Sequence, residues 1–224
     1  MKGPRKGPAT DYVITLGLAV ILALMIRHFL IEPYQIPNSA MKPTVLPGDV
    51  ILVGQWPFYS QPLSPTRARG DIVVFSCEPA PTSTPLQAIR RIVGLPGDQI
   101  EMNQGHLSIN QQALPWSPIP PVPQQKTACF RETLPGGRSF SACTDLEAPL
   151  SFPAQTVPQN HFFVAGDFRS DILAKSPTYC PLAARDTIRG KPWMVWLSID
   201  PLNTVQGSNW FPQLRRERIF QKIE

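Results

Sequence analysis

The apolar residues of this chain fall into one long run followed by many short ones. The long run covers residues 12–31, and a helix of about 20 residues reaches roughly 30 Å, enough to span a lipid bilayer. Arg27 and His28 lie near its far end, where their polar groups can reach the lipid headgroups. The run predicts a transmembrane helix. A cleaved signal peptide fits less well because no small-residue cleavage site follows, and a buried core helix is the other alternative.

Beyond residue 31 the apolar runs are short and are bounded by Gly, Pro, Asn and Asp, a pattern typical of strands and turns. Leu95-Pro-Gly-Asp98 predicts a turn between two strands, and Asn103-Gln-Gly105 predicts a hairpin. The strand-forming segments are expected at 34–36, 50–53, 72–75, 88–94, 99–101, 107–110, 157–167, 188–191 and 193–198. The Pro-rich residues 111–156 predict an insertion or subdomain.

Proline content and charge narrow the class of protein. The 224 residues include 27 prolines, well above the usual roughly 5%, and proline breaks helices but is tolerated at turns and sheet edges. We therefore expect a mainly β fold. The net charge of +5 is dispersed, and its densest basic clusters, at 2–6 and 215–218, lack the interleaved aromatic residues of a nucleic-acid site. No nucleic-acid partner is expected.

The cysteines predict an oxidising compartment. They lie at 77, 129, 143 and 180, and no pair has the Cys-x-x-Cys spacing of metal or redox sites, so no metal is expected. Pro135-Gly-Gly137 predicts a reversal of the chain between Cys129 and Cys143. We therefore predict a Cys129–Cys143 disulfide, which leaves Cys77 and Cys180 as a second bridge or as free buried thiols.

The charges beside the long apolar run predict its orientation. Basic residues precede the run, and basic flanks stay on the cytoplasmic side of a membrane. We therefore expect a single-pass protein with a cytoplasmic N-terminus at 1–11, an anchor at 12–31 and an exported domain at 32–224. The exported side would be the periplasm, the cell surface or the thylakoid lumen, and the lipid bilayer is the first expected partner.

Ordered sequence blocks run from the anchor almost to the C-terminus. They are Glu32-Pro-Tyr-Gln-Ile-Pro37, Met41-x-Pro-Thr44, Gly48-Asp49, Arg69-Gly-Asp-Ile-Val-Val-Phe75, Arg91-Ile-Val-Gly-Leu-Pro-Gly-Asp98 and Gly166-Asp167. In this order the blocks resemble the type I signal peptidase family. The resemblance implies a membrane-anchored, mostly antiparallel β domain. Family members cut exported preproteins after small residues with a Ser nucleophile and a Lys base, and they use no cofactor.

Both reacting positions differ here from the family pattern. The nucleophile maps to Ala40 and the base maps to Arg90. A methyl group cannot attack a carbonyl, and a guanidinium keeps its proton in a protein, so neither residue can perform the family's step. In the third block Asp167 and Arg169 match the family and are expected to be structural, whereas Phe168 replaces an Asn and the run after Arg169 is not recognisable.

The substrate-binding residues implied by the resemblance are better kept. They are Tyr34, Ile36, Pro37, Asn38 and Met41. Asn38 stands where family members place a hydroxyl beside the nucleophile, and its amide could donate to an oxyanion. Ordinary strand packing near a membrane is the alternative for all five.

The sequence therefore predicts a non-catalytic, signal-peptidase-like membrane protein, a pseudoenzyme. Its expected partners are exported preproteins or signal peptides, or an active signal peptidase paralogue. One alternative is an active signal peptidase with a displaced dyad using Ser39, although neighbours in an extended segment point to opposite faces. Another is a structural subunit of a membrane complex.

Overall fold

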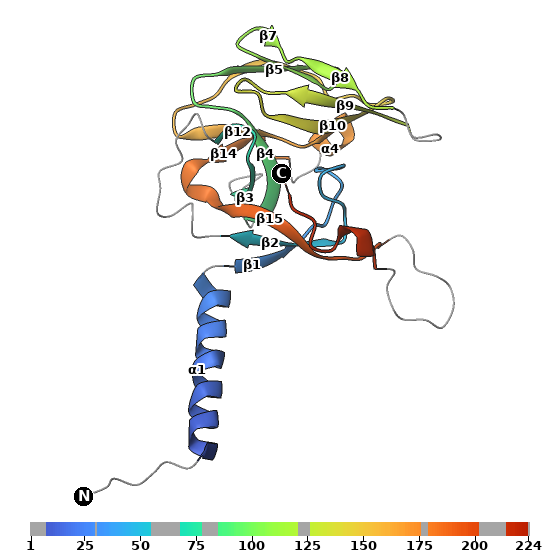
Figure 1. Ribbon diagram of the computed structural model, residues 1–224. Coiled ribbons are helices and arrows are strands. Elements are labelled where there is room, and N and C mark those ends of the chain that lie inside the picture. Colours follow the sequence, from blue (N-terminus) through green and yellow to red (C-terminus); the bar gives the residue numbers. More distant parts are fainter. Residues whose placement is uncertain are drawn as a thin grey trace, which may run out of the picture.

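A single long helix stands apart from a β-rich body (Figure 1). The computed structural model describes residues 8–29, 31–54, 68–77, 85–120, 126–175, 179–201 and 214–223. The helix, α1, covers Pro8–Phe29, so it begins before the predicted anchor, and Ile31 already belongs to the first strand. Among the described residues, no helix combines the length and apolarity needed to cross a membrane. The transmembrane segment at 12–31 therefore stays a prediction.

The largest sheet runs through the lower part of the body, next to α1 (Figure 1). Its seven strands lie in the order β1-β2-β15-β3-β4-β12-β14, and all neighbours are antiparallel. The strands are β1 Ile31–Gln35, β2 Asp49–Gly54, β15 Ile188–Ser198, β3 Ile72–Cys77, β4 Leu86–Gly94, β12 His161–Ala165 and β14 Leu182–Ala184. Segments far apart in the sequence thus become neighbours.

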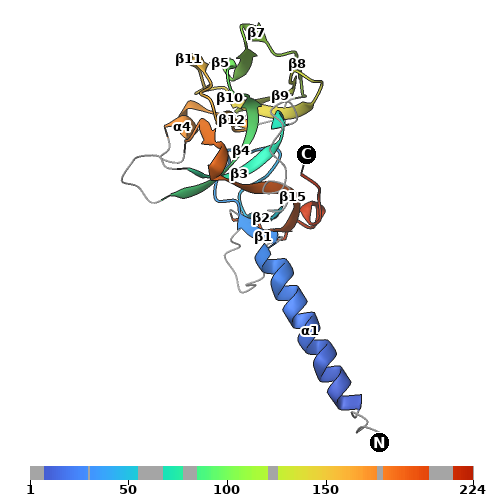
Figure 2. The ribbon, with the colours of Figure 1, turned by 90° about the vertical axis from the view of Figure 1, so that its left-hand side faces the viewer.

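Two smaller sheets form the part of the body far from α1 (Figures 1 and 2). Their orders are β13-β10-β9-β8 and β11-β5-β6-β7. The strands are β13 Phe168–Arg169, β10 Ser139–Asp145, β9 Thr127–Thr133, β8 Trp116–Pro118, β11 Phe152–Thr156, β5 Gln99–Asn103, β6 His106–Ile109 and β7 Gln112–Ala113. Short helical turns complete the described elements, namely α4 Asp171–Ala174, η1 Arg185–Thr187 and η2 Arg216–Arg218.

The predicted turns form where the sequence places glycine. Gln104 and Gly105 both have positive φ between β5 and β6, as a tight hairpin turn requires. Gly136 and Gly137 also have positive φ and reverse the chain between β9 and β10. The described parts of residues 111–156 are therefore strands and turns, and the parallel pairing of β10 with β13 joins them to the chain next to Gly166.

Two disulfides join strands of this body. Cys129 and Cys143, the pair predicted to be bridged, lie opposite each other on β9 and β10 and are joined. The second bridge joins Cys77, at the end of β3, to Cys180, just before β14. It therefore ties the end of β3 to the residues that lead into β14, and these two strands are not adjacent in the seven-stranded sheet.

Candidate functional site

The segment around Ala40 is a series of turns after residue 37. The amide of Val45 donates to the Met41 carbonyl at 3.0 Å, and the amide of Lys42 donates to the Ser39 carbonyl at 3.0 Å. The extended geometry used to place Ser39 and Ala40 on opposite faces is therefore wrong for this segment. Ile36 and Met41 are buried and pack in the hydrophobic cluster that includes Val45, so their side chains hold the segment against the large sheet.

Ala40 is buried and is contacted by Asn38, Gly166 and Phe168. Its side chain is buried, with the residue 3% exposed. Its amide donates to Oδ1 of Asn38 at 3.2 Å, and its carbonyl accepts from the Phe168 amide at 3.0 Å. A Cβ on Gly166 would overlap that same carbonyl oxygen, so only glycine lets the chain approach so closely. Asn38 thus accepts a hydrogen bond here rather than presenting only a donor.

Asp167 joins three separate blocks of the sequence. Its carboxylate is fully buried and accepts from Arg91 at two atoms, Nε at 2.9 Å and Nη2 at 2.8 Å. The Thr44 hydroxyl donates to the same carboxylate. Arg91 also donates to the Gly70 carbonyl at 2.9 Å. This bidentate pair therefore fixes the position of residues 166–168 relative to β4 and to the Ala40 segment.

Arg90 lies beside Arg91 on β4 but has different neighbours. It is 5% exposed, and its Nη1 donates to the Ile89 carbonyl at 2.7 Å. Burial lowers the pKa of the Arg90 guanidinium, and interactions with Tyr179, Tyr34 and Asp167 oppose that shift. Arginine's ordinary pKa is so high that the group stays charged. It can bind an anion or a carbonyl, but it cannot accept a proton.

Two tyrosines flank this guanidinium. Burial raises the pKa of both the Tyr34 and the Tyr179 phenol, and the charge of Arg90 opposes the shift in each case. Both phenols therefore stay protonated near neutral pH. The Tyr34 hydroxyl donates to the Gln87 carbonyl at 2.7 Å, which brings β1 and the start of β4 within reach of one side chain.

Ser39 lines a pocket of its own next to this region. The pocket has a volume of about 550 Å³, and its wall includes Lys42, Lys126, Phe168 and both cysteines of the 129–143 disulfide. Ser39 and Lys42, residues of the kinds that form a Ser–Lys dyad, therefore line one pocket. The lining is apolar over most of its area.

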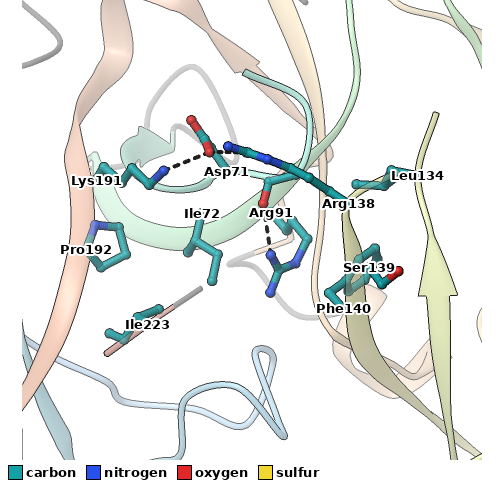
Figure 3. A pocket seen from close by; sticks show the side chains of 11 residues that line it. Asp71, Ile72, Arg91, Leu134, Arg138, Ser139, Phe140, Lys191, Pro192 and Ile223 are labelled. Atoms are coloured by element: carbon teal, nitrogen blue, oxygen red, sulfur yellow. Dashed lines mark hydrogen bonds and ion pairs between the residues drawn. The ribbon is translucent and has the colours of Figure 1, made fainter. Parts of the chain in front are cut away.

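A second cavity lies on the Arg91 side of β4. It measures about 330 Å³ and is lined by residues of β3, β10 and β15 and by the C-terminal segment. Figure 3 shows Arg138 and Lys191 converging on Asp71 at its rim. Ile72, Phe140 and Ile223 supply apolar walls. The cavity combines a charged rim with apolar walls and holds no residue predicted to react.

Arg169 has a structural position between the two upper sheets. It is 1% exposed and forms a buried ion pair with Glu132 of β9. One of its nitrogens also donates to the Gly105 carbonyl. The guanidinium thus ties β13 to both upper sheets. Glu132 itself is fully buried, a position that its place in the Pro-rich segment does not indicate.

Three residues that contribute to the site were not among the predicted ones. Gly166 contacts Ala40, Arg91 holds Asp167, and Tyr179 flanks Arg90. Gly166 and Arg91 stand inside the recognised blocks, so their position in the sequence was a signal. No sequence signal identifies Tyr179, because it lies outside every block and comes close to Arg90 only in the folded chain.

Comparison with known proteins gives one family. The family model described as "Signal peptidase, peptidase S26" matches residues 9–175. Signal peptidase I P of Bacillus subtilis subsp. natto is 29% identical over 169 residues, which cover 75% of this chain and 79% of that protein. Signal peptidase I of Rickettsia felis is 27% identical over 246 aligned positions, covering 92% and 90%.

A solved structure was also matched. The crystal structure of a signal peptidase I from Enterococcus faecalis V583 is 22% identical, covers 55% of this chain and 93% of its own, and has a TM-score of 0.28. At that score the superposition does not bear on the fold. The family match, which spans most of the chain and every block from Glu32 to Asp167, decides the assignment: this chain belongs to the signal peptidase family, peptidase S26.

Proposed function

We propose that this chain binds exported preprotein segments without cleaving them. The observation that carries the proposal is the burial of a methyl at Ala40 and of a guanidinium at Arg90, the two positions that the resemblance aligns with the family's reacting residues. Hydrolysis by a Ser–Lys dyad needs a hydroxyl that attacks and a neutral amine that takes its proton. Ala40 has no hydroxyl, and Arg90 cannot give up its proton.

The binding role is supported by the strand edges near these residues. β1 is an edge strand of the large sheet, and edge strands bind extended peptides through backbone hydrogen bonds. Tyr34 and Pro37 are partly or fully exposed on this side of the domain, and Asn38 contacts Ala40. Preprotein segments, or an extended segment of an active paralogue, are the partners that such an edge fits.

The same proposal includes a membrane anchor. The side chains of residues 12–22 on α1 are exposed, and large apolar ones such as Tyr12, Val13 and Leu16 are at least two-thirds exposed. Such a surface is unfavourable in water and favourable in lipid. With the basic N-terminus in the cytoplasm, residues 32–224 would lie on the exported side, where oxidising conditions permit the two disulfides.

A cleavage assay tests the loss of catalysis. Full-length protein in detergent would be incubated with a preprotein that carries an Ala-x-Ala site. We expect no product from wild type, Ala40→Ser or Arg90→Lys, because each single change leaves the dyad incomplete. Removal of a catalytic Ser costs about a million-fold in a comparable protease. The double variant should give at most a trace of product, since Phe168 and the run after it replace the residues that orient the family's Lys.

One observation favours a second candidate, an active enzyme with a displaced dyad. Ser39 and Lys42 line the same pocket, and the turn at residues 39–42 is what brings them there. In this case wild type would cleave the preprotein, and Ser39→Ala and Lys42→Met would each abolish cleavage. That outcome would overturn the non-catalytic proposal.

A further inference from the structure

The cavity beside Arg91 is separate from the region around Ala40 and Arg90. It is lined by residues of β3, β10, β15 and the C-terminal segment, and neither Ala40 nor Arg90 belongs to its lining. Successive residues of a strand face opposite sides, so Arg91 reaches this cavity while Arg90 faces the other side of β4. The cavity volume of about 330 Å³ lies at the lower end of the roughly 300–1,000 Å³ that small-molecule sites occupy. The cavity therefore has the size for a small ligand.

The lining of this cavity carries an excess of one positive charge. Oδ1 of Asp71 accepts from Nζ of Lys191 at 2.8 Å and from Nη1 of Arg138. Figure 3 shows these two side chains approaching the carboxylate from opposite sides. The third cation of the lining, Arg91, is already paired with Asp167. One carboxylate thus faces two cations at the rim, and a ligand with a single negative charge would balance them.

Both rim cations are accessible and have donors left for a ligand. The side chains of Arg138 and Lys191 are 55% and 41% exposed. Among the described residues, the Arg138 guanidinium donates only from Nη1, to Asp71 and to the Arg69 carbonyl at 3.3 Å, and Lys191 donates only to Asp71. Nε and Nη2 of the arginine and two N–H groups of the lysine therefore remain for an anion.

The backbone under the rim fixes the position of Arg138. Gly70 has a φ of +91°, and a Cβ built on it would come within 3.0 Å of Cδ of Arg138. The arginine side chain thus lies directly over this glycine, a place that any larger residue would obstruct. Since its Nη1 also reaches the Arg69 carbonyl, the guanidinium is oriented before a ligand binds, which lowers the entropic cost of binding.

The walls below the rim are apolar. They are formed by Ile72, Leu134, Phe140, Pro192 and Ile223. All five residues are buried, so a hydrocarbon group that enters between them is removed from water, and its burial favours binding. A small inorganic anion would leave these walls uncovered. The combination of walls and rim therefore fits a molecule with an apolar body and one anionic group.

We propose that this cavity binds small organic monocarboxylates, with the carboxylate between Arg138 and Lys191 and a compact aryl or branched alkyl body against the apolar walls. The inference is independent of the proposed binding of preprotein segments, because the two regions share no lining residue. Phenylacetate is the simplest probe of this class, since it joins one carboxylate to one ring.

An occupant of this cavity would also contact residues that hold the fold together. Arg91 pairs with Asp167, and its guanidinium carbon lies 4.5 Å from the ring centroid of Phe140, on β10. Since β3 and β15 belong to the large sheet and β10 to an upper sheet, a bound ligand would touch both. Binding to the folded state alone raises its stability, so phenylacetate should raise the Tm.

Methyl NMR tests the inference on full-length protein in a non-ionic detergent. Isoleucine Cδ1 labelling reports on Ile72 and Ile223 in the cavity walls, and Ile100, in the core of the upper sheets, is the internal reference. The probes are phenylacetate, phenylacetamide, which lacks the charge, and acetate, which lacks the ring. We expect phenylacetate to shift the two wall signals but not that of Ile100, and to bind about tenfold tighter than either control. It should also raise the Tm more than phenylacetamide does at equal concentration.

Variants then assign the charge selectivity to the rim. Arg138→Gln and Lys191→Gln should each reduce the preference for phenylacetate over phenylacetamide several-fold, and the double variant should abolish it. Arg189→Gln is the matched control, because it removes an exposed cation from β15 outside the cavity, and it should bind as wild type does.

Three results would overturn the inference. They are equal wild-type affinities for phenylacetate and phenylacetamide, equal affinities for phenylacetate and acetate, and a titration in which the Ile72 and Ile223 signals move no more than that of Ile100. If the double variant does not fold, the wild-type comparison and the two single variants still decide.

Discussion

At the scale of single residues, two adjacent arginines show how position on a strand sets function. Arg91 points to Asp167 and holds the Ala40 segment in place, whereas Arg90 interacts with Tyr34 and Tyr179 and donates to the Ile89 carbonyl. Successive residues of a strand face opposite sides, so the two guanidinium groups reach different neighbours. An Arg90→Lys change should therefore leave the Arg91–Asp167 ion pair in place.

Removal of Asp167 should destabilise the whole domain. In Asp167→Ala, the Arg91 guanidinium, whose side chain is 3% exposed, would remain buried without its carboxylate. Loss of one partner of a buried pair costs about 3–5 kcal/mol. Guanidinium titration of the full chain in detergent, followed by tryptophan fluorescence, measures the change in the free energy of unfolding.

The control for this variant is an ion pair on the exposed surface. Glu147 and Lys126 have side chains 67% and 75% exposed, and such pairs contribute about 0–1 kcal/mol. Glu147→Ala should therefore unfold close to wild type. Similar stabilities for Asp167→Ala and Glu147→Ala would contradict the structural role assigned to Asp167.

At the scale of elements, the sequence predicts strands well and contacts between them poorly. The strands at 50–53, 72–75 and 107–110 and the hairpin at 103–105 correspond to β2, β3 and the β5–β6 pair, because glycine and proline mark the turns locally. The Thr44–Asp167 contact joins residues separated by 123 positions, and no local pattern encodes it. The turns at 38–45 depart from the extended segment that the sequence predicts there, because the amides of Lys42 and Val45 bond to carbonyls three and four residues earlier.

The disulfide between β9 and β10 should stabilise the hairpin that carries it. Cys129 and Cys143 are separated by 14 positions, and closing a loop of about 15 residues contributes roughly 3 kcal/mol in the chain-entropy model. The hairpin turn already restricts this loop in the unfolded chain. We therefore expect the free energy of unfolding of the Cys129→Ser/Cys143→Ser variant to fall by somewhat less than this amount. Peptide mapping under non-reducing conditions checks the pairing in exported protein, and two free thiols there would refute it.

At the scale of the whole molecule, the feature that bears most on function is the separation of α1 from the β body. Both views show the helix extending away from the large sheet, with β1 following it directly (Figures 1 and 2). The side chains described on the helix are exposed and largely apolar. An exposed apolar surface is unfavourable in water, and in the proposed membrane location lipid would cover it.

The last prediction is therefore the orientation of the chain across a membrane. Protease added to sealed spheroplasts should digest the β domain, because basic residues that precede an apolar anchor are expected to stay in the cytoplasm. Changing Lys2, Arg5 and Lys6 together to Asp should weaken that retention and reduce the digested fraction. Lys191→Gln, which leaves the N-terminus unchanged, is the control and should be digested like wild type. Complete protection of the wild-type domain would exclude an exported location and, with it, the proposed binding of exported preprotein segments.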